Sequence, residues 1–438
     1  MRSYLVLLFC LPLPFGANVV WAWGLFAAVI FALLGIELFK LGKNQQLQKL
    51  DSIALPPAFI AAKPVLLALG AVQVLVLLQW LMTSGFQHGH DVYLSLLQGC
   101  ALVGFFALSL LLIRNRDDIR RVVWTMILAA GFQAIYGAFM VLSGLEYGFF
   151  IKKEAYLGKA TGTFINRNHL AGYLEMAIAL GIGLLLASST RYRGDWRQRL
   201  RQSIEMLLSP KVLARLLLAI MVIALVLTRS RMGNTAFFAS LMLTGLLALL
   251  LMKNKSRSTT LLLSSLLVID IAIVGTFFGV EKVADRIQNS STESESRDEV
   301  TAATLETWQE HPLLGIGAGG FYYSYPSFRY AEHKSELTTR YAHNDYVQFL
   351  AEFGLIAFLL LLGSVLYCLW CGIQAMRQRN SSLHQGMGFA SCMGLIAIAI
   401  HSTVDFNLQI PANAFVFMLL MAMALIARHG SYRASSKA

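Results

Sequence analysis

Apolar residues in this sequence come in runs of about 20 that recur along the whole chain. A helix of that length spans the roughly 30 Å hydrocarbon core of a lipid bilayer. Only 14% of the 438 residues are charged, whereas about a quarter are charged in a typical soluble domain. The sequence therefore excludes a water-soluble globule and predicts an all-α, polytopic integral membrane protein.

There are about twelve such runs, and each is expected to form one transmembrane helix. The first is short and ends in Leu-Pro-Leu-Pro. Because the apolar pattern resumes almost at once, we interpret it as a retained first helix rather than a signal peptide. The runs lie near residues 4–15, 19–40, 63–84, 93–113, 122–143, 168–188, 211–228, 233–252, 259–279, 350–373, 386–406 and 409–428.

The spacing of the runs divides the chain into four parts. Residues 1–150 hold the first five helices, and residues 151–279 hold helices 6–9. A large loop with short amphipathic helices is expected between helices 9 and 10, at residues 280–349. Residues 350–438 hold helices 10–12 and a tail.

Membrane topology explains the net charge of +12. Cytoplasmic segments of membrane proteins carry an excess of Lys and Arg. If both termini are cytoplasmic, 24 of the 36 basic residues fall on the cytoplasmic side and 12 on the other. We therefore predict cytoplasmic termini and an external loop at 280–349. Membrane lipids, and not nucleic acid, are the expected partners of the basic segments.

Two arginines lie between the seventh and eighth runs, in the sequence Thr-Arg-Ser-Arg at 228–231. The connection is only a few residues long, so Arg229 and Arg231 are expected near the membrane boundary. Charged groups at such a depth are costly unless they are paired, which makes them functional candidates. The alternative is that both side chains extend to the interface as anchors.

The external loop contains two further signals. Ser296 and Glu299 have the spacing of a capping box, which predicts an amphipathic helix over about residues 297–310. Arg297 would then stand in the first turn, where a cation is unfavourable, and this mismatch indicates a partner. The glycine-rich stretch 315–320, which includes Gly317, is typical either of a tight turn or of a nest of backbone N–H groups that faces an anion.

Polar residues also stand at the external ends of three runs. His343 precedes Asn344, which we predict as the N-cap of the tenth helix. A histidine at the positive end of a helix is kept neutral, as a general base requires; an interfacial hydrogen-bonding role is the alternative. Arg167 and His169 open the sixth run in a setting that suits an anion or a sugar. Asp405 and Asn407 precede the last run and are candidates for organising the external face.

Other polar residues carry less information. His88, His90 and Asp91 have no further ligand at suitable spacing, and no Asp-x-Asp motif stands out, so no metal site is predicted. Asp270 lies in the middle of the ninth run and is expected to be paired.

Taken in order, these motifs resemble the bacterial O-antigen ligases, together with the related O-antigen polymerases and protein O-oligosaccharyltransferases. The resemblance spans about residues 160–410. It rests on the twelve runs, the large loop between the ninth and tenth, Thr-Arg-Ser-Arg at 228–231, Arg297 ahead of Trp-Gln-Glu-His-Pro-Leu-Leu-Gly-Ile-Gly at 308–317, and His-Asn-Asp-Tyr at 343–346.

The resemblance implies the fold of the C-type membrane glycosyltransferases and an inverting, metal-independent reaction without a cofactor. The donor would be a glycan on undecaprenyl diphosphate, and the acceptor a lipid A-core glycolipid or a glycan, at the periplasmic face of the inner membrane. Arg231 and Arg297 would hold the diphosphate, and His343 would deprotonate the acceptor hydroxyl. The expected substrate contacts are Arg229, Arg167, His169, Asn344 and Gly317.

A lipid-linked glycan transporter is the alternative from a different functional class. Transporters typically show internal repeats, broken helices and polar residues at the bilayer midplane. In this sequence the polar residues gather at the external ends of the runs, with Asp270 the main exception. This distribution favours the enzyme.

Overall fold

The structure is a computed structural model that describes residues 1–48, 55–82, 88–149, 151–187, 210–252, 260, 264–265, 292–325 and 339–430. Within these ranges the fold is helical except for one short antiparallel hairpin, in which Tyr147 pairs with Lys152. The prediction of an all-α polytopic membrane protein is confirmed. Asp270 and almost all of the ninth predicted run, 259–279, lie outside the described residues.

The helices follow the predicted runs closely. The elements are α1 (Arg2–Cys10), η1 (Phe15–Ala17), α2 (Val20–Gln48), α3 (Pro57–Ala61), α4 (Lys63–Met82), α5 (Gly89–Leu112), α6 (Arg116–Ser143), β1 (Tyr147–Gly148), β2 (Ile151–Lys152), α7 (Arg167–Ala187), α9 (Pro210–Leu227), α10 (Arg231–Leu251), α13 (Thr292–Glu310), α14 (Phe321–Ser324), α15 (Asp345–Gln378), α16 (Ser382–His401), η3 (Asn407–Gln409) and α17 (Pro411–His429).

Nine helices in the described part of the chain are long and apolar enough to cross a membrane: α2, α4, α5, α6, α7, α10, α15, α16 and α17. The apolar part of α9, Val212–Leu227, is shorter. Helix α1 has nine residues, so it is about 13 Å long and cannot span the bilayer alone. It packs into the core instead, where Tyr4 Oη and Ser109 Oγ share a hydrogen bond of 2.7 Å. The described residues thus support a multi-pass membrane protein without establishing a count of twelve.

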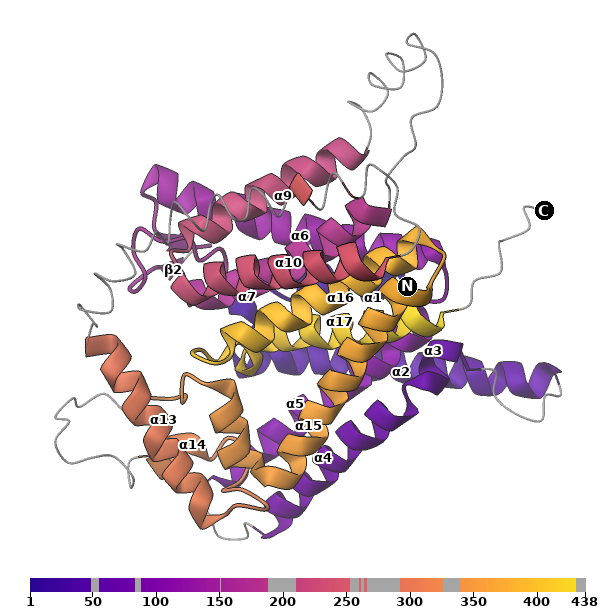
Figure 1. The fold of residues 1–438 in the computed structure, drawn as a ribbon. Coiled ribbons are helices and arrows are strands. Elements are labelled where there is room, and N and C mark those ends of the chain that lie inside the picture. Colours follow the sequence, from indigo (N-terminus) through magenta and orange to yellow (C-terminus); the bar gives the residue numbers. More distant parts are fainter. Residues whose placement is uncertain are drawn as a thin grey trace, which may run out of the picture.

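Helices α7, α16 and α17 form the centre of the bundle, and almost all of their residues are buried (Figure 1). Gly183 of α7 and Gly386 of α16 face each other so closely that a Cβ on either would collide with the carbonyl oxygen of the other. Small residues permit this kind of backbone approach in membrane helices. The close contact fixes α7 against α16.

The ends of several helices meet at one end of the bundle (Figure 1). The N–H of Ala160, in the segment before α7, donates to the carbonyl of Leu227 at the end of α9 (3.0 Å). Asn413 at the start of α17 donates to the carbonyl of His169 at the start of α7 (3.0 Å). These bonds hold the start of α7 beside the start of α17 and beside the turn from α9 to α10.

Helix α15 is broken near its start. Gly354 has φ 74° and ψ 172°, which is not helical, and the chain turns sharply there. Residues 345–353 form a short first segment, and residues 355–378 form the long helix that crosses the bundle (Figure 1). The tenth predicted run, 350–373, therefore includes the break, which separates the first segment from the long helix.

Candidate functional site

The turn between α9 and α10 presents two arginines outward. Thr228 Oγ1 accepts from the N–H of Ser230 (3.1 Å), and Ser230 Oγ caps α10 by accepting from the N–H of Gly233 (3.2 Å). Arg229 holds a left-handed backbone conformation with φ 52°, which is uncommon for a residue with a side chain. Both Arg229 and Arg231 are exposed.

Arg231 is the first residue of α10, where the helix macrodipole is positive. A guanidinium there is destabilised by the backbone unless an anion is bound nearby. The backbone of Gly233, two residues on, lies against Ala171 and Glu175 of α7. The pair of arginines is therefore held beside the start of α7.

Arg167 opens α7 at the same end of the bundle. Its guanidinium lies over the Tyr156 ring, 5.8 Å from the ring centre, in a cation–π contact. The segment that carries Tyr156 is fixed by Lys153, whose Nζ donates to Glu146 Oε2 (2.6 Å) and to the carbonyls of Tyr156 (3.2 Å) and Lys159 (3.0 Å). Helices α7 and α10 thus each begin with an arginine, Arg167 and Arg231.

His343 directly precedes α15. Asn344 is the N-cap, as predicted: its Oδ1 accepts from the N–H groups of Tyr346 (3.1 Å) and Val347 (3.2 Å). His343 itself has φ 54°, a left-handed conformation that persists only where the surrounding structure enforces it. Its side chain is half-buried.

The ring of Phe406 brings the two candidate histidines together. His343 meets this ring at a centroid distance of 4.9 Å and His169 at 4.7 Å, both edge-on, while Tyr341 stacks on it at 4.3 Å. Phe406 belongs to the connection between α16 and α17 and was not singled out from the sequence. An aromatic residue in an apolar region gives no signal of such a role.

Asp405, next to Phe406, joins the connection before α17 to the start of α7. Its carboxylate accepts from Asn168 Nδ2 and from the N–H of Phe406 (2.8 Å), and lies 3.8 Å from His169 Nε2. Burial alone would raise the pKa of Asp405. The charges that His169, His401 and His343 carry when protonated, with the Phe406 N–H, hold the pKa below its usual value.

A second buried pair joins α7 to α16 less than two helical turns further along α7. His401 Nδ1 lies 2.8 Å from Glu175 Oε1, and neither side chain is exposed. Neither residue was singled out from the sequence, because single polar residues within apolar runs have no distinguishing pattern. The pair fixes the end of α16 that leads into the Asp405 connection.

The glycine-rich stretch has a structural role at the break in α15. The N–H of Ile316 donates to the carbonyl of Ala351 (2.9 Å), and that of Gly317 donates to the carbonyl of Glu352 (3.1 Å). The N–H of Leu355 in turn donates to Pro312 (2.9 Å). The stretch therefore supplies partners for the groups that the break would leave unpaired, and the N–H of Gly317 is engaged in this contact.

Helix α13 begins at Thr292, so the prediction that Ser296 caps it is wrong: Ser296 lies inside the helix. One face of the helix is buried, at Val300, Ala303, Thr304 and Thr307. Val300 and Ala303 pack with Phe321, Tyr325 and Ala342, the residue before His343. Arg297 lies one turn before Val300 in this helix, and its side chain is outside the described residues.

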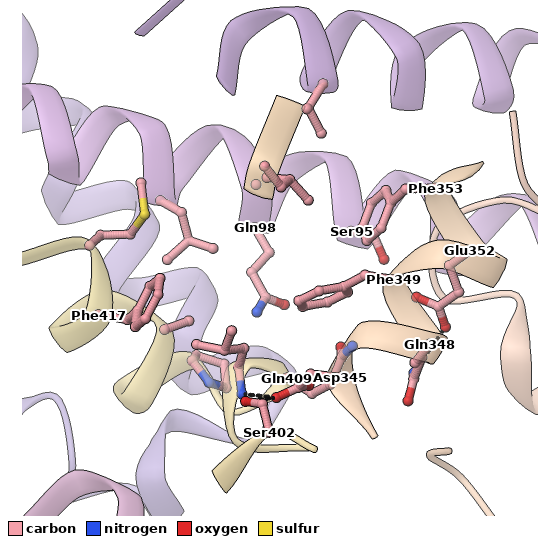
Figure 2. Close-up of a pocket in the computed structure, with 18 of the residues that line it drawn as sticks. Ser95, Gln98, Asp345, Gln348, Phe349, Glu352, Phe353, Ser402, Gln409 and Phe417 are labelled. Carbon is pink, nitrogen blue, oxygen red and sulfur yellow. Dashed lines mark hydrogen bonds between the residues drawn. The ribbon is translucent and has the colours of Figure 1, made fainter. Parts of the chain in front are cut away.

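A cavity of about 820 Å³ adjoins the site (Figure 2). Its walls come from both segments of α15 and from α2, α4, α5, α14, α16 and α17. Tyr341 and Asp345 line it, whereas His343, Arg229 and Arg231 do not. Tyr341, which stacks on Phe406, therefore belongs both to the cavity wall and to the Phe406 cluster.

Residues 216–362 match the family model described as O-Antigen ligase. The matched segment contains Arg229, Arg231, Arg297, Gly317, His343 and Asn344, and it ends before Asp405 and Phe406. Arg167 and His169 lie before it. No curated protein matches the chain. The resemblance inferred from the motifs is thus confirmed for this segment.

Proposed function

From the O-antigen ligase family domain at residues 216–362, we propose that this protein is a membrane glycosyltransferase that moves a glycan from undecaprenyl diphosphate onto a lipid A-core acceptor. The reaction takes place at the periplasmic face of the inner membrane, with both termini in the cytoplasm. The observation that carries the proposal concerns His343, whose ring contacts Phe406. His343 lies in the family-matched segment, which also carries two exposed arginines, Arg229 and Arg231.

The arginines hold the leaving group. As the bond between the sugar and the diphosphate breaks, negative charge grows on the diphosphate oxygens, and guanidinium groups stabilise that charge with paired hydrogen bonds. Arg229 and Arg231 at the start of α10 supply two such groups. Arg297 is proposed as a third, and Arg167 at the start of α7 extends the basic surface.

His343 is proposed as the general base. A sugar hydroxyl is a weak nucleophile, and a neutral imidazole within hydrogen-bond reach takes its proton as the new bond forms. The hydroxyl oxygen attacks the anomeric carbon opposite the diphosphate, the carbon–oxygen bond to phosphate breaks, and the electron pair leaves on the diphosphate. The configuration at the anomeric carbon is thereby inverted, and the proton ends on His343.

The reaction is tested with purified protein in lipid nanodiscs, an undecaprenyl-diphosphate glycan and a lipid A-core acceptor, with chelator present throughout. The expected product is the glycosylated lipid A-core with inverted anomeric configuration. A product in which glycan is added only to another lipid-linked glycan identifies a polymerase. Movement of the intact donor across the bilayer without transfer identifies a transporter and refutes the proposal.

The surface glycans of a deletion strain provide the matching cellular test. Uncapped lipid A-core indicates a ligase, and a cap of a single repeat indicates a polymerase. A glycoprotein lacking its sugar indicates a protein O-oligosaccharyltransferase.

The orientation is tested by labelling single cysteines in a cysteine-free background. Gln309 is exposed on α13, and Gln378 is exposed at the far end of α15. With the outer membrane opened, a membrane-impermeant maleimide is expected to label Gln309→Cys. Gln378→Cys should react only after the inner membrane is permeabilised. The reverse pattern contradicts a periplasmic site.

A further inference from the structure

The cavity beside the site has an apolar part and a polar part (Figure 2). Aliphatic and aromatic side chains line most of it, among them Leu69, Phe353, Leu361, Phe417 and Met421. The polar side chains concentrate where the first segment of α15 meets α5 and the connection before α17, as Asp345, Gln348, Glu352, Gln98 and Gln409 show (Figure 2). An occupant that fits both parts has an apolar chain and a polar head.

Three polar atoms of lining residues have no hydrogen-bond partner in the described part of the chain. They are Asp345 Oδ1, Gln409 Nε2 and Gln73 Oε1, and all three are inaccessible to solvent. The side chain of Asp345 is 1% exposed. A buried polar group without a partner is costly, so these atoms mark places where a bound molecule would supply the missing bonds.

The three atoms define the chemistry of that molecule. The Gln409 amide nitrogen donates, whereas the Gln73 amide oxygen and the Asp345 carboxyl oxygen accept. A hydroxyl group both donates and accepts, so a head group with several hydroxyls satisfies such a set. The other oxygen of Asp345 is already used, since it accepts from Ser402 Oγ (2.7 Å) and from the N–H of Leu408 (3.0 Å). Asp345 is therefore held in place with Oδ1 left over.

The lining residues offer a diphosphate few cationic partners. Three carboxyl groups line it, those of Asp91, Asp345 and Glu352, and Arg340 is the basic residue among the lining side chains. The exposed arginines of the α9–α10 turn lie elsewhere. A diphosphate is thus favoured at those arginines, and an uncharged, hydroxyl-bearing group is favoured in the cavity.

The cavity is adjacent to the proposed base. Tyr341 lines it and also stacks on Phe406, whose ring contacts His343. Asp345 lines it two residues after His343. A sugar head bound there is next to Tyr341 and Asp345, the two lining residues that flank the proposed base in sequence.

We propose that this cavity is the acceptor subsite: it binds an uncharged sugar head through Asp345, Gln409 and Gln73, with the attached alkyl chain in the apolar part. The assignment of the cavity to the acceptor rests on the proposed glycosyl transfer, whereas the binding of a sugar head does not. The two are therefore tested separately.

The binding test uses octyl glucoside as the probe, at concentrations below micelle formation, on the full-length protein in lipid nanodiscs. Scintillation proximity with the tritiated probe is expected to show saturable binding. Gln409→Leu should weaken it about 10-fold, because one hydrogen bond of about 1.4 kcal/mol corresponds to that factor. The Gln409 Nε2 atom makes no hydrogen bond within the described part of the chain, and leucine nearly keeps the size of the side chain.

Two controls separate recognition from general damage. Gln378→Leu makes the same change at an exposed position at the other end of α15 and should leave binding unchanged. The binding of octyl phosphate, which has the same chain with an anionic head, should depend on Arg231 and not on Gln409. Any one of three results overturns the proposal: octyl glucoside binds without saturation, Gln409→Leu and Gln378→Leu weaken its binding equally, or octyl phosphate displaces it.

The activity test assigns the subsite to the acceptor. Octyl glucoside should inhibit transfer in competition with the acceptor and not with the donor, and Gln409→Leu should raise KM for the acceptor alone. Competition with the donor overturns the assignment. If the wild-type protein transfers no glycan, the proposed function fails while the binding result still decides whether the cavity takes a sugar head.

Discussion

The imidazole of His343 meets the phenyl ring of Phe406 nearly at a right angle, with 4.9 Å between ring centroids and 78° between planes. The residue that carries the ring is fixed by the carboxylate of Asp405, which accepts from its N–H. Edge-on aromatic contacts of this kind prefer one geometry. The orientation of the proposed base thus depends on a residue that lies 63 positions later and outside the family match.

Replacing this ring should impair turnover more than substrate binding. We expect Phe406→Leu to lower kcat by about 10-fold or more with KM within about 2-fold, because a misplaced catalytic group loses rate steeply. Steady-state kinetics measures both constants. Phe132→Leu, at an exposed position on α6, is the control; an equal loss there would contradict a role in orienting His343.

Removal of the proposed base should abolish most of the transfer. His343→Gln keeps a hydrogen-bonding side chain but cannot take up the proton, so we expect a loss of about 10²–10⁴-fold in kcat. Donor binding and thermal stability should change little. Near-normal turnover of the purified variant in nanodiscs would leave His343 as a structural residue.

Arg231→Lys should lose about 10²-fold in kcat although the charge is retained, because an ammonium group cannot reproduce the two parallel donors of a guanidinium. Arg231→Ala should be at least as impaired. Arg377→Lys, at an exposed site in the last turn of α15, serves as the matched control. If Arg231→Lys and Arg231→Ala both retain full activity, the residue is an interfacial anchor.

Asp405 makes stability sensitive to acid. Its pKa in the folded protein lies below the usual value, which is about 3.9 in the unfolded chain. The carboxylate therefore contributes stability that is fully present above pH 4 and is lost as pH falls through the lowered value. Asp405→Asn should have a lower Tm than the wild type at pH 6–7, and the difference should shrink below pH 4. A difference that is constant from pH 7 to pH 3 would contradict this.

Because of the break in α15, substitution by alanine should have opposite effects on stability at two glycines of this helix. At Gly354 the backbone has φ 74° and an added Cβ would collide with the carbonyl of Leu313, so Gly354→Ala should cost at least about 1–3 kcal/mol. At Gly363 a Cβ meets nothing within 4 Å, and Gly363→Ala should stabilise the helix by about 0.5–1 kcal/mol. Thermal unfolding in matched nanodiscs compares the two. Equal shifts would show that the turn at Gly354 is not required.

The regular parts of the fold could be predicted because apolar length and end signals are local. Asn344 marked the start of α15, and the runs located the described spans. The break at Gly354 could not be predicted, because a glycine within an apolar run is also compatible with a continuous membrane helix. Its cause lies in the backbone of residues 312–317, which is far away in sequence.

Residues of the candidate site could be predicted only where a charged residue or a helix-capping residue interrupts or borders an apolar run. Arg231 and His343 met that condition. Phe406 and Asp345 did not, since an aromatic ring in an apolar region and an acid after an N-cap are both common. Their roles come from contacts between α15 and the connection at 402–410, which no local pattern contains.

The break at Gly354 also resolves a mismatch of lengths. As one straight helix, the 34 residues of α15 would extend about 51 Å, far more than the roughly 30 Å of bilayer hydrocarbon. The chain bends the surplus back instead of projecting it into water. One continuous stretch of chain therefore serves as both a membrane span and a wall of the cavity. The depth of the span in the bilayer consequently determines the distance of His343 from the membrane surface.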